Sequence, residues 1–328
     1  MSLVKIVRRR IQKRSAALAV AATSLLATAV AVAPAGLARA DNARPTTAAA
    51  TAAICTAPTA HAALAAKLSK DIANTIHGRS GHIAIRVEDV KTGVECRYNE
   101  GSRSHSASVV KVTILAALLH WKKSPTSLTS KEKYEATLMI EQSNNAAATY
   151  LWNDVGHTRL NQFIAAATMT ETELNSGGLW GLSLITARDE LQQMRLLTGH
   201  NSVLSDSSRA YELYLMNHVV SWQRWGVPTG APSGLTVYVK NGWLNDPVLW
   251  VINSIGAVEG HGRDYKMAIL TYSNPGEQYG INTVNAIAKV ANSDLNAGLP
   301  AAGTPLAPAT LPRSMQGRPD EVLPTGAR

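Results

Sequence analysis

The strand-like segments of this chain fall into two groups, and only helical patterns lie between them. Residues 82–87 and 94–98 flank a turn and carry the alternation of apolar and polar side chains that predicts a hairpin. Three further strand-like runs follow much later, at 235–239, 249–258 and 266–272. A sheet assembled from both ends of a chain has to place the intervening helices on one face or in a separate subdomain.

Helical patterns surround and separate the two strand groups. Apolar residues at helical spacing open the domain at 62–76 and close it at 280–296. A nearly continuous apolar run at 109–121 predicts a buried helix. The other helical patterns lie at 129–141, 144–153, 158–167, 187–198 and 206–221. The predicted fold class is therefore α+β: an αβα sandwich whose antiparallel sheet is flanked by the terminal helices, with an inserted all-helical subdomain.

Positive charge is concentrated at the N-terminus. Residues 1–40 hold seven Lys and Arg and no acidic residue, so the formal charge of +9 falls to +2 for residues 41–328. The basic start, the apolar stretch 16–33 and the small-x-small pattern at 38–40 predict a signal peptide over 1–40. We expect a secreted or cell-envelope protein with no stable membrane span after cleavage. An uncleaved anchor is the alternative, and a nucleic-acid partner is not expected.

The segments beside the folded domain differ from it in composition. Residues 41–58 are rich in Ala and Thr and read as a flexible lead-in, and the Pro/Ala-rich stretch 297–328 reads as a disordered tail. The domain itself is expected over 59–296. Cys55 and Cys96 are the only cysteines, and in an exported chain an isolated pair favours a disulfide over a metal site.

A serine and a lysine stand one helical turn apart at the start of the apolar run. If Ser108 opens that helix, Lys111 lies on the same face, with about 5–6 Å between the Cβ atoms. A lysine in a buried cleft can lose its proton and act as a general base for a serine nucleophile. The same spacing at Ser130 and Lys133 opens a polar helix and is better explained as helix capping.

Two further motifs follow the serine and the lysine in the chain. The first joins two helical patterns and has an N-cap as its alternative reading: Ser143, Asn144 and Asn145. The second ends a strand-like run, where glycine permits close approach of a ligand, and an ordinary turn is its alternative: Lys240, Asn241 and Gly242. A Lys-Thr-Gly at 91–93 precedes Ser108 and lies in a hairpin turn, so we do not take it as a third motif of this set.

Ser-x-x-Lys, Ser-x-Asn and Lys-x-Gly in this order resemble the signature motifs of class A β-lactamases and penicillin-binding proteins. The resemblance spans roughly residues 60–296. It implies that Ser108 attacks the carbonyl, that Lys111 is a general base and that Ser143 relays a proton to the leaving nitrogen. It also implies that Asn145 holds the substrate's side-chain amide and that Lys240 attracts the substrate carboxylate.

The resemblance also implies an oxyanion hole and a deacylation base. The backbone N–H groups of Ser108 and of Trp243, which follows Gly242, would form the oxyanion hole. The segment 171–175 spells the Glu-x-x-Leu-Asn pattern that holds a water in class A enzymes. Glu171 would be the deacylation base and Asn175 a second ligand of that water, while a solvated acidic loop is the alternative.

Several positions depart from the family pattern. Asn144 replaces an aspartate, Asn241 replaces a hydroxyl residue that contacts the substrate, and Trp243 stands where a small residue is common. Arg224 is a candidate for the carboxylate-binding arginine only by its rough position. The tryptophans at 180, 222, 225, 243 and 250 are expected to serve packing rather than a carbohydrate or peptide platform.

Three functions stay open at this point. The leading one is a monomeric serine hydrolase that opens a small-molecule β-lactam through an acyl-enzyme on Ser108. The second is a penicillin-binding D-alanyl peptide hydrolase or transferase that acts on cell-wall peptides, and Glu171 is the feature that separates the two. The third is a catalytically weakened binding protein on the same fold. No cofactor and no metal are expected, because lysine-assisted serine chemistry requires none.

Overall fold

The computed structural model describes residues 53–245 and 250–298. In that part of the chain, six strands form an antiparallel sheet in the order β1-β3-β2-β8-β7-β6. Their bounds are β1 Cys55–Thr56, β2 His82–Asp89, β3 Val94–Tyr98, β6 Thr236–Asn245, β7 Trp250–Gly260 and β8 Arg263–Asn274. Two short strands, β4 (Ser104–His105) and β5 (Leu184–Ile185), pair separately.

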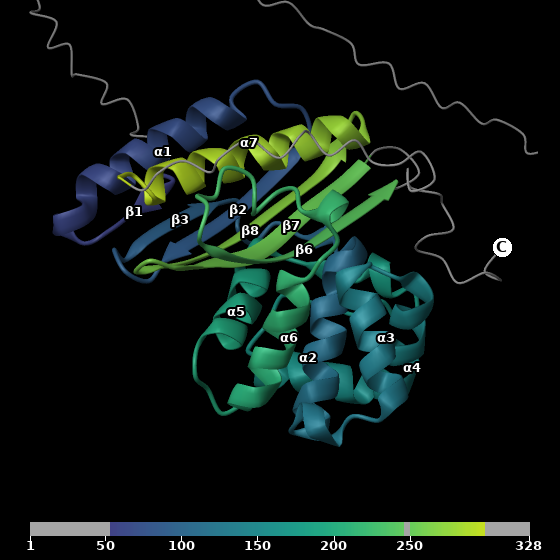
Figure 1. Ribbon diagram of the computed structural model, residues 1–328. Helices are drawn as coiled ribbons and strands as arrows, with labels where there is room; N and C mark the ends of the chain where they lie inside the picture. The colour runs from purple at the N-terminus through teal and green to yellow at the C-terminus, as the bar shows by residue number, and fades with distance from the viewer. Residues whose placement is uncertain (1–52, 246–249, 299–328) are drawn as a thin grey trace, which may run out of the picture. The chain divides into compact units, whose positions relative to one another are not determined.

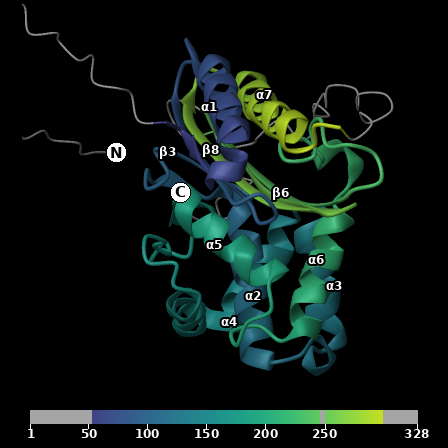
Figure 2. The same cartoon turned by 90° about the vertical axis from the view of Figure 1, so that its left-hand side faces the viewer.

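Helices cover both faces of the sheet. The terminal helices α1 (Ala62–Ile76) and α7 (Glu277–Leu295) lie side by side on one face (Figure 1). The other face carries the inserted helices, as Figure 2 shows from the side. These are α2 Val110–Lys122, α3 Ser130–Glu141, α4 Asn145–Ala166, α5 Ala187–Thr198 and α6 Asp206–Asn217. The predicted α+β sandwich with its inserted helical subdomain is confirmed.

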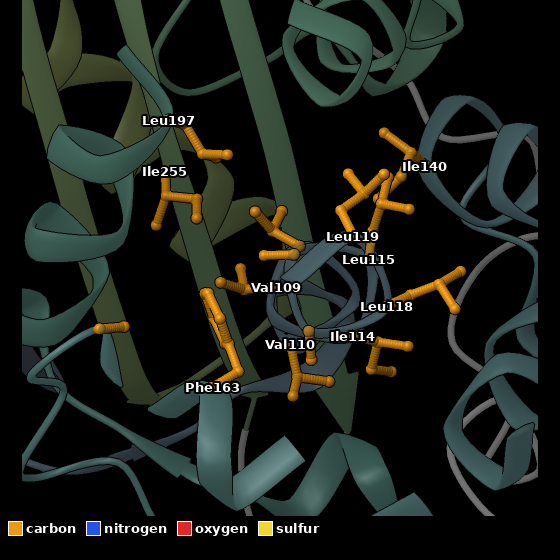
Figure 3. Close-up of a cluster of buried hydrophobic side chains, with 14 of the residues drawn as sticks. Val109, Val110, Ile114, Leu115, Leu118, Leu119, Ile140, Phe163, Leu197 and Ile255 are labelled. Carbon is orange, nitrogen blue, oxygen red and sulfur yellow. The ribbon is translucent and has the colours of Figure 1, made fainter. Parts of the chain in front are cut away.

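Helix α2 forms the centre of the helical layer. Its residues 110–119 are all buried, as expected for a helix that is apolar on every side. Ile114 and Leu118 belong to a cluster that also takes in Phe163 of α4 and Ile255 of β7 (Figure 3). The cluster therefore joins the helices to the sheet and fixes the position of the residues just before α2.

Strand β6 lies at the edge of the sheet and presents different residues to its two sides. Val239 and Trp243 belong to the core between the sheet and the terminal helices. Because side chains alternate along a strand, Lys240 and Gly242 face the opposite side, toward the start of α2. The third motif therefore lies inside a strand, and the reading of it as an ordinary turn is wrong.

Local sequence signals explain where several helices begin. Thr129 and Glu132 form the expected capping box at α3, with the Glu132 N–H donating to Thr129 Oγ1 at 3.1 Å. The two helical patterns expected at 144–153 and 158–167 form one helix, α4, which is interrupted at Gly156, where φ is 75°. Strands β6 and β8 run several residues longer than predicted, β7 lies close to its predicted bounds, and α6 ends at Asn217, short of the expected 221.

The N-terminal part of the domain differs from the expectation. Cys55 pairs with Cys96 across β1 and β3 and is joined to it by a disulfide, so the lead-in predicted to be flexible up to 58 is ordered from Cys55. The disulfide and the strand pairing hold it against the sheet. The predicted signal peptide (1–40), the rest of the lead-in (to 52) and the tail from 299 lie outside the described residues.

Candidate active site

Ser108 lies in a short 3-10 turn, Ala107–Val109, immediately before α2. The backbone of Ala107 has a φ of 47°, a left-handed conformation that non-glycine residues rarely adopt. Ala107 and Val109 are buried, whereas Ser108 is partly exposed. The turn therefore presents the Ser108 side chain at the N-terminal end of a buried helix, where the helix dipole favours developing negative charge.

Ser143 lies between two helices. Gln142 ends α3, and Asn144 caps α4 by accepting a hydrogen bond from the Ala147 N–H at 2.9 Å. Ser143 itself has a φ of 56°. The capping reading of this motif is therefore confirmed for Asn144, and the chain reversal places Ser143 beside two lysines.

Lys111 is wholly buried and reaches this helix junction from α2. Its Nζ donates to the backbone oxygen of Ser143 at 2.6 Å and lies 3.1 Å from Ser143 Oγ. It also donates to Asn145 Oδ1 at 2.7 Å. The first two motifs thus meet through direct hydrogen bonds.

Lys240 reaches the same hydroxyl from β6. Its Nζ lies 3.0 Å from Ser143 Oγ and 3.0 Å from the backbone oxygen of Asn241. Lys240 is wholly buried, and burial lowers the pKa of its ammonium group to about 7. A hydroxyl oxygen can accept two hydrogen bonds and still donate its own proton. Ser143, held by Lys111 and Lys240, is therefore suited to pass a proton to a third group.

Gly242 brings β6 against the nucleophile turn. A Cβ atom at this position would lie 2.8 Å from the Ser106 oxygen and 2.9 Å from the Ser108 nitrogen. Asn253 on the neighbouring strand reinforces the contact by donating to the His105 oxygen at 2.8 Å. Only glycine allows the two backbones to approach this closely. The edge of β6 thus passes beside the backbone N–H predicted for the oxyanion hole.

The side chains of Asn241 and Trp243 lie on the other face of β6. Asn241 is buried and its amide donates to the Gln223 oxygen at 2.7 Å and to the Trp225 oxygen at 2.9 Å. The indole of Trp243 packs near Trp225, with 6.2 Å between ring centroids. The structure does not bring these two side chains to Ser143. A substrate contact of Asn241 and a backbone role of Trp243 stay predictions.

Arg224 lies in the segment between α6 and β6. Its guanidinium group donates to the Asn217 oxygen at 2.8 Å and to the Val237 oxygen at 3.1 Å. Burial lowers the pKa of this group. Its carboxylate-binding role stays a prediction, and the contacts that the structure gives it are backbone oxygens.

Glu171 and Asn175 have hydrogen-bond partners at the start of α5 and in their own loop. Glu171 pairs with Arg188 at 2.7 Å and accepts a hydrogen bond from Thr186 Oγ1 at 3.0 Å, at the start of α5. Asn175 Oδ1 accepts from the N–H groups of Gly177 at 2.9 Å and Leu179 at 3.2 Å. Glu171 therefore ties its loop to the start of α5, and Asn175 stabilises the loop itself. Their predicted roles in deacylation stay predictions.

Trp180 is a neighbour of the site that the sequence reasoning assigned to packing alone. Its ring centroid lies 4.8 Å from Lys111 Nζ, a cation–π distance. The indole is buried, and its Nε1 donates to Thr149 Oγ1 at 3.1 Å. A tryptophan in a loop without periodicity gives no signal of such a contact in the sequence.

In residues 53–245 and 250–298, no three His, Cys, Asp or Glu side chains gather closely enough to hold a metal ion. Among the same residues, no helix is long and apolar enough to cross a membrane.

A sequence model of the beta-lactamase enzyme family matches residues 67–135 and 119–295. Together these segments contain Ser108, Lys111, Ser143 and Lys240. No curated protein sequence matches the chain.

Solved structures of the same fold include β-lactamases and PBP-A. The TLA-1 extended-spectrum β-lactamase is similar with a TM-score of 0.61 and 16% identity over 70% of this chain and 98% of its own. A class A β-lactamase from Mycobacterium abscessus is similar with a TM-score of 0.60 and 17% identity, over 70% of this chain and 99% of its own. PBP-A is similar with a TM-score of 0.59 and 19% identity, over 69% of this chain and 94% of its own. At these identities the likeness establishes the fold.

Proposed function

The chain belongs to the beta-lactamase enzyme family, and from that premise we propose that it opens β-lactam amides through an acyl-enzyme on Ser108. The observation that carries the proposal is the position of the Ser143 hydroxyl, 3.1 Å from Lys111 Nζ and 3.0 Å from Lys240 Nζ. Two buried lysines around one hydroxyl make a proton path that a merely structural cluster does not need.

Acylation follows from this geometry. The proton of the Ser108 hydroxyl passes to Lys111 in its neutral form, and Ser108 Oγ attacks the lactam carbonyl carbon. Backbone N–H groups beside Gly242 stabilise the oxyanion. As the C–N bond breaks, Ser143 gives its proton to the leaving nitrogen, and the Lys111 ammonium group, which holds the proton taken from Ser108, restores a proton to Ser143 Oγ. The proton of Ser108 thus ends on the nitrogen, and an ester remains.

Lys240 gives the site its preference for anionic substrates. Its buried ammonium group makes hydrogen bonds to Ser143 Oγ and to the Asn241 oxygen, and both of these partners are uncharged. A substrate carboxylate beside the group would therefore favour its charged form. Penicillins and acyl-D-alanyl peptides both carry a carboxylate near the amide that is attacked. This chemistry fits either substrate class.

A cell-wall peptide is the second candidate substrate. The observation that favours it is the engagement of Glu171 by Arg188 and Thr186, because an enzyme that clears β-lactams needs a base for the deacylating water. A peptide hydrolase or transferase uses the same acylation residues and does not depend on that glutamate.

We also propose that the protein works outside the cytoplasm. The basic and apolar character of residues 1–40 and the disulfide between Cys55 and Cys96 support export. N-terminal sequencing of the protein recovered from the culture medium or cell envelope tests this. A start near residue 41 supports cleavage, and a start at residue 1 with the protein held in the cytosol contradicts it.

Labelling with a fluorescent penicillin tests the acyl-enzyme. The full chain, Ser108→Ala and Ser130→Ala are incubated with the probe, denatured at successive times and separated by gel electrophoresis. Ser130 is the matched control, since it also precedes a lysine by three residues but opens α3. We expect label on the full chain and on Ser130→Ala. Ser108→Ala should carry none. Label that survives in Ser108→Ala contradicts the proposal.

A further inference from the structure

The Trp180 indole lies against the general-base candidate of the site. We propose that Trp180 is a positioning residue that shields the acyl-enzyme on Ser108 from water and so lengthens its life. The inference rests on the proposed function, since it concerns the fate of the acyl-enzyme that acylation would form. It makes the protein one that retains a β-lactam covalently rather than one that clears it.

The indole and the backbone of Trp180 are both held by hydrogen bonds. Trp180 is 2% exposed, and its Nε1 donates to Thr149 Oγ1 of α4 at 3.1 Å. The backbone oxygen of Trp180 accepts a hydrogen bond from Ser106 Oγ at 3.3 Å. The Ser106 N–H in turn donates to the Ser183 oxygen at 2.8 Å. The loop that carries the indole is therefore tied both to the helical layer and to the turn that carries the nucleophile.

The ring takes up one side of the Lys111 ammonium group. Its centroid lies 4.8 Å from Nζ, while oxygens of Ser143 and Asn145 approach Nζ at 2.6–3.1 Å. A water activated by Lys111 has to lie about 2.6–3.2 Å from Nζ. The aromatic face occupies one of the sides on which that water could lie, and it offers the water only a weak acceptor.

The carboxylate that the sequence offers as a base is not free to replace Lys111. Deacylation adds water to the ester carbon, breaks the bond to Ser108 Oγ and sends one water proton to a base. Glu171 is paired with Arg188 at 2.7 Å and bonded to Thr186 at 3.0 Å. The Asn175 oxygen is bonded to two N–H groups of its own loop. Both side chains therefore already accept hydrogen bonds from protein groups.

The experiment measures acylation and deacylation separately. The full chain, Trp180→Phe and Trp180→Leu are mixed with a penicillin, and intact mass is followed over time. Trp152→Leu is the matched control, because Trp152 is 5% exposed in the same helical layer and packs against His157. Melting temperatures identify any variant that has lost its fold, and Trp180→Phe keeps a ring beside Lys111 even if Trp180→Leu fails to fold.

The expected result is a split between the two rates. The adduct on the full chain persists, Trp180→Leu shortens its half-life by about tenfold or more, and the acylation rate changes by less than about threefold. Trp180→Phe and Trp152→Leu retain the long half-life. A merely structural role of Trp180 would lower acylation and leave the half-life as it was.

Two outcomes overturn the inference and are distinguishable. An adduct that forms on the full chain and disappears within seconds, or that persists equally in Trp180→Leu, overturns the shielding role and leaves the proposed function in place. No adduct on the full chain or on any folded variant removes the proposed function, and the inference falls with it.

Discussion

The ammonium group of Lys240 lies 3.0 Å from the hydroxyl oxygen of Ser143 and is wholly buried. A charged group in such surroundings is stable only if the site supplies or awaits a countercharge. The two residues come from β6 and from the junction between α3 and α4, so the contact exists only when the sheet and the helical layer pack together. It is therefore a sensitive point for testing how the site works.

Acylation by an anionic β-lactam should weaken above neutral pH. Burial lowers the pKa of Lys240 to about 7, so the group loses its charge, and its attraction for the substrate carboxylate, as the pH rises through that value. The second-order acylation constant, measured from pH 5.5 to 9, should fall with a midpoint near 7. In Lys240→Arg, whose charge persists, this inflection should vanish, as it should for a β-lactam ester that lacks the carboxylate. An inflection unchanged in both would contradict the assignment.

Gly242→Ala should impair acylation without unfolding the protein. The new Cβ would lie 2.8–2.9 Å from backbone atoms of Ser106, Ser108 and Val109, so β6 or the nucleophile turn has to move. A shift of that kind commonly lowers a catalytic rate by about a hundredfold. Gly276→Ala is the control, since nothing lies within 4 Å of a Cβ at that position. Equal acylation rates for the two variants would argue against a functional contact between β6 and the turn.

The match between sequence and structure is best where capping signals bound a helix. Helix α5 runs over Ala187–Thr198 as predicted, because Thr186 caps it by accepting from the Asp189 N–H. The arrangement of the strands in two groups also predicted correctly that the sheet lies between two layers of helices. The short strands β1, β4 and β5 escaped prediction, since two residues show no periodicity and such strands exist only through their partners.

In the site, too, some features could be predicted from the sequence and others only from the structure. Ser108, Lys111, Ser143 and Lys240 could be named from motifs, and hydrogen bonds link both lysines to Ser143. Sequence could not show that Asn241 turns away from the helices, because that depends on which face of β6 meets the helical layer. The contact between Trp180 and Lys111 depends on the path of an irregular loop, and no spacing in the chain encodes that path.

The buried carboxyl group of Glu190 should make the fold less stable in alkali. Burial, with a smaller contribution from Asp189, raises the pKa of Glu190 to about 8. The folded state therefore holds a proton that the unfolded chain releases, so this stability is complete below about pH 4.5 and is lost as the pH rises through 8. Urea unfolding should show Glu190→Gln to be more stable than the natural chain at pH 9, by at least about 1 kcal/mol.

An exposed carboxylate provides the control for that comparison. Glu173 is 65% exposed in its ion pair with Arg103, so Glu173→Gln should leave the pH dependence of stability unchanged. Some alkaline loss should remain in Glu190→Gln, because burial also raises the pKa of Glu212. If Glu190→Gln and the natural chain lose stability in parallel between pH 6 and 9, Glu190 is not the group responsible.

Removing the disulfide should destabilise the domain without abolishing the site. The bridge joins residues 41 positions apart, and a loop of that length corresponds to about 4 kcal/mol of unfolded-state entropy. The double variant Cys55→Ser, Cys96→Ser should therefore unfold at lower denaturant, yet still be labelled by penicillin at saturating probe. Reduction of the natural chain should reproduce the shift. An unchanged unfolding midpoint would mean that β1 is held by its other contacts alone.

The most direct test of the acyl-enzyme is peptide mapping of the penicillin adduct by mass spectrometry. The full chain is quenched in acid after brief reaction and digested, and the fragments are sequenced beside those of Ser108→Ala. The mass of one intact penicillin on Ser108 itself is the expected result, with no adduct in Ser108→Ala. An adduct on any other residue, or none on a folded chain at saturating penicillin, would contradict the role of Ser108 as nucleophile.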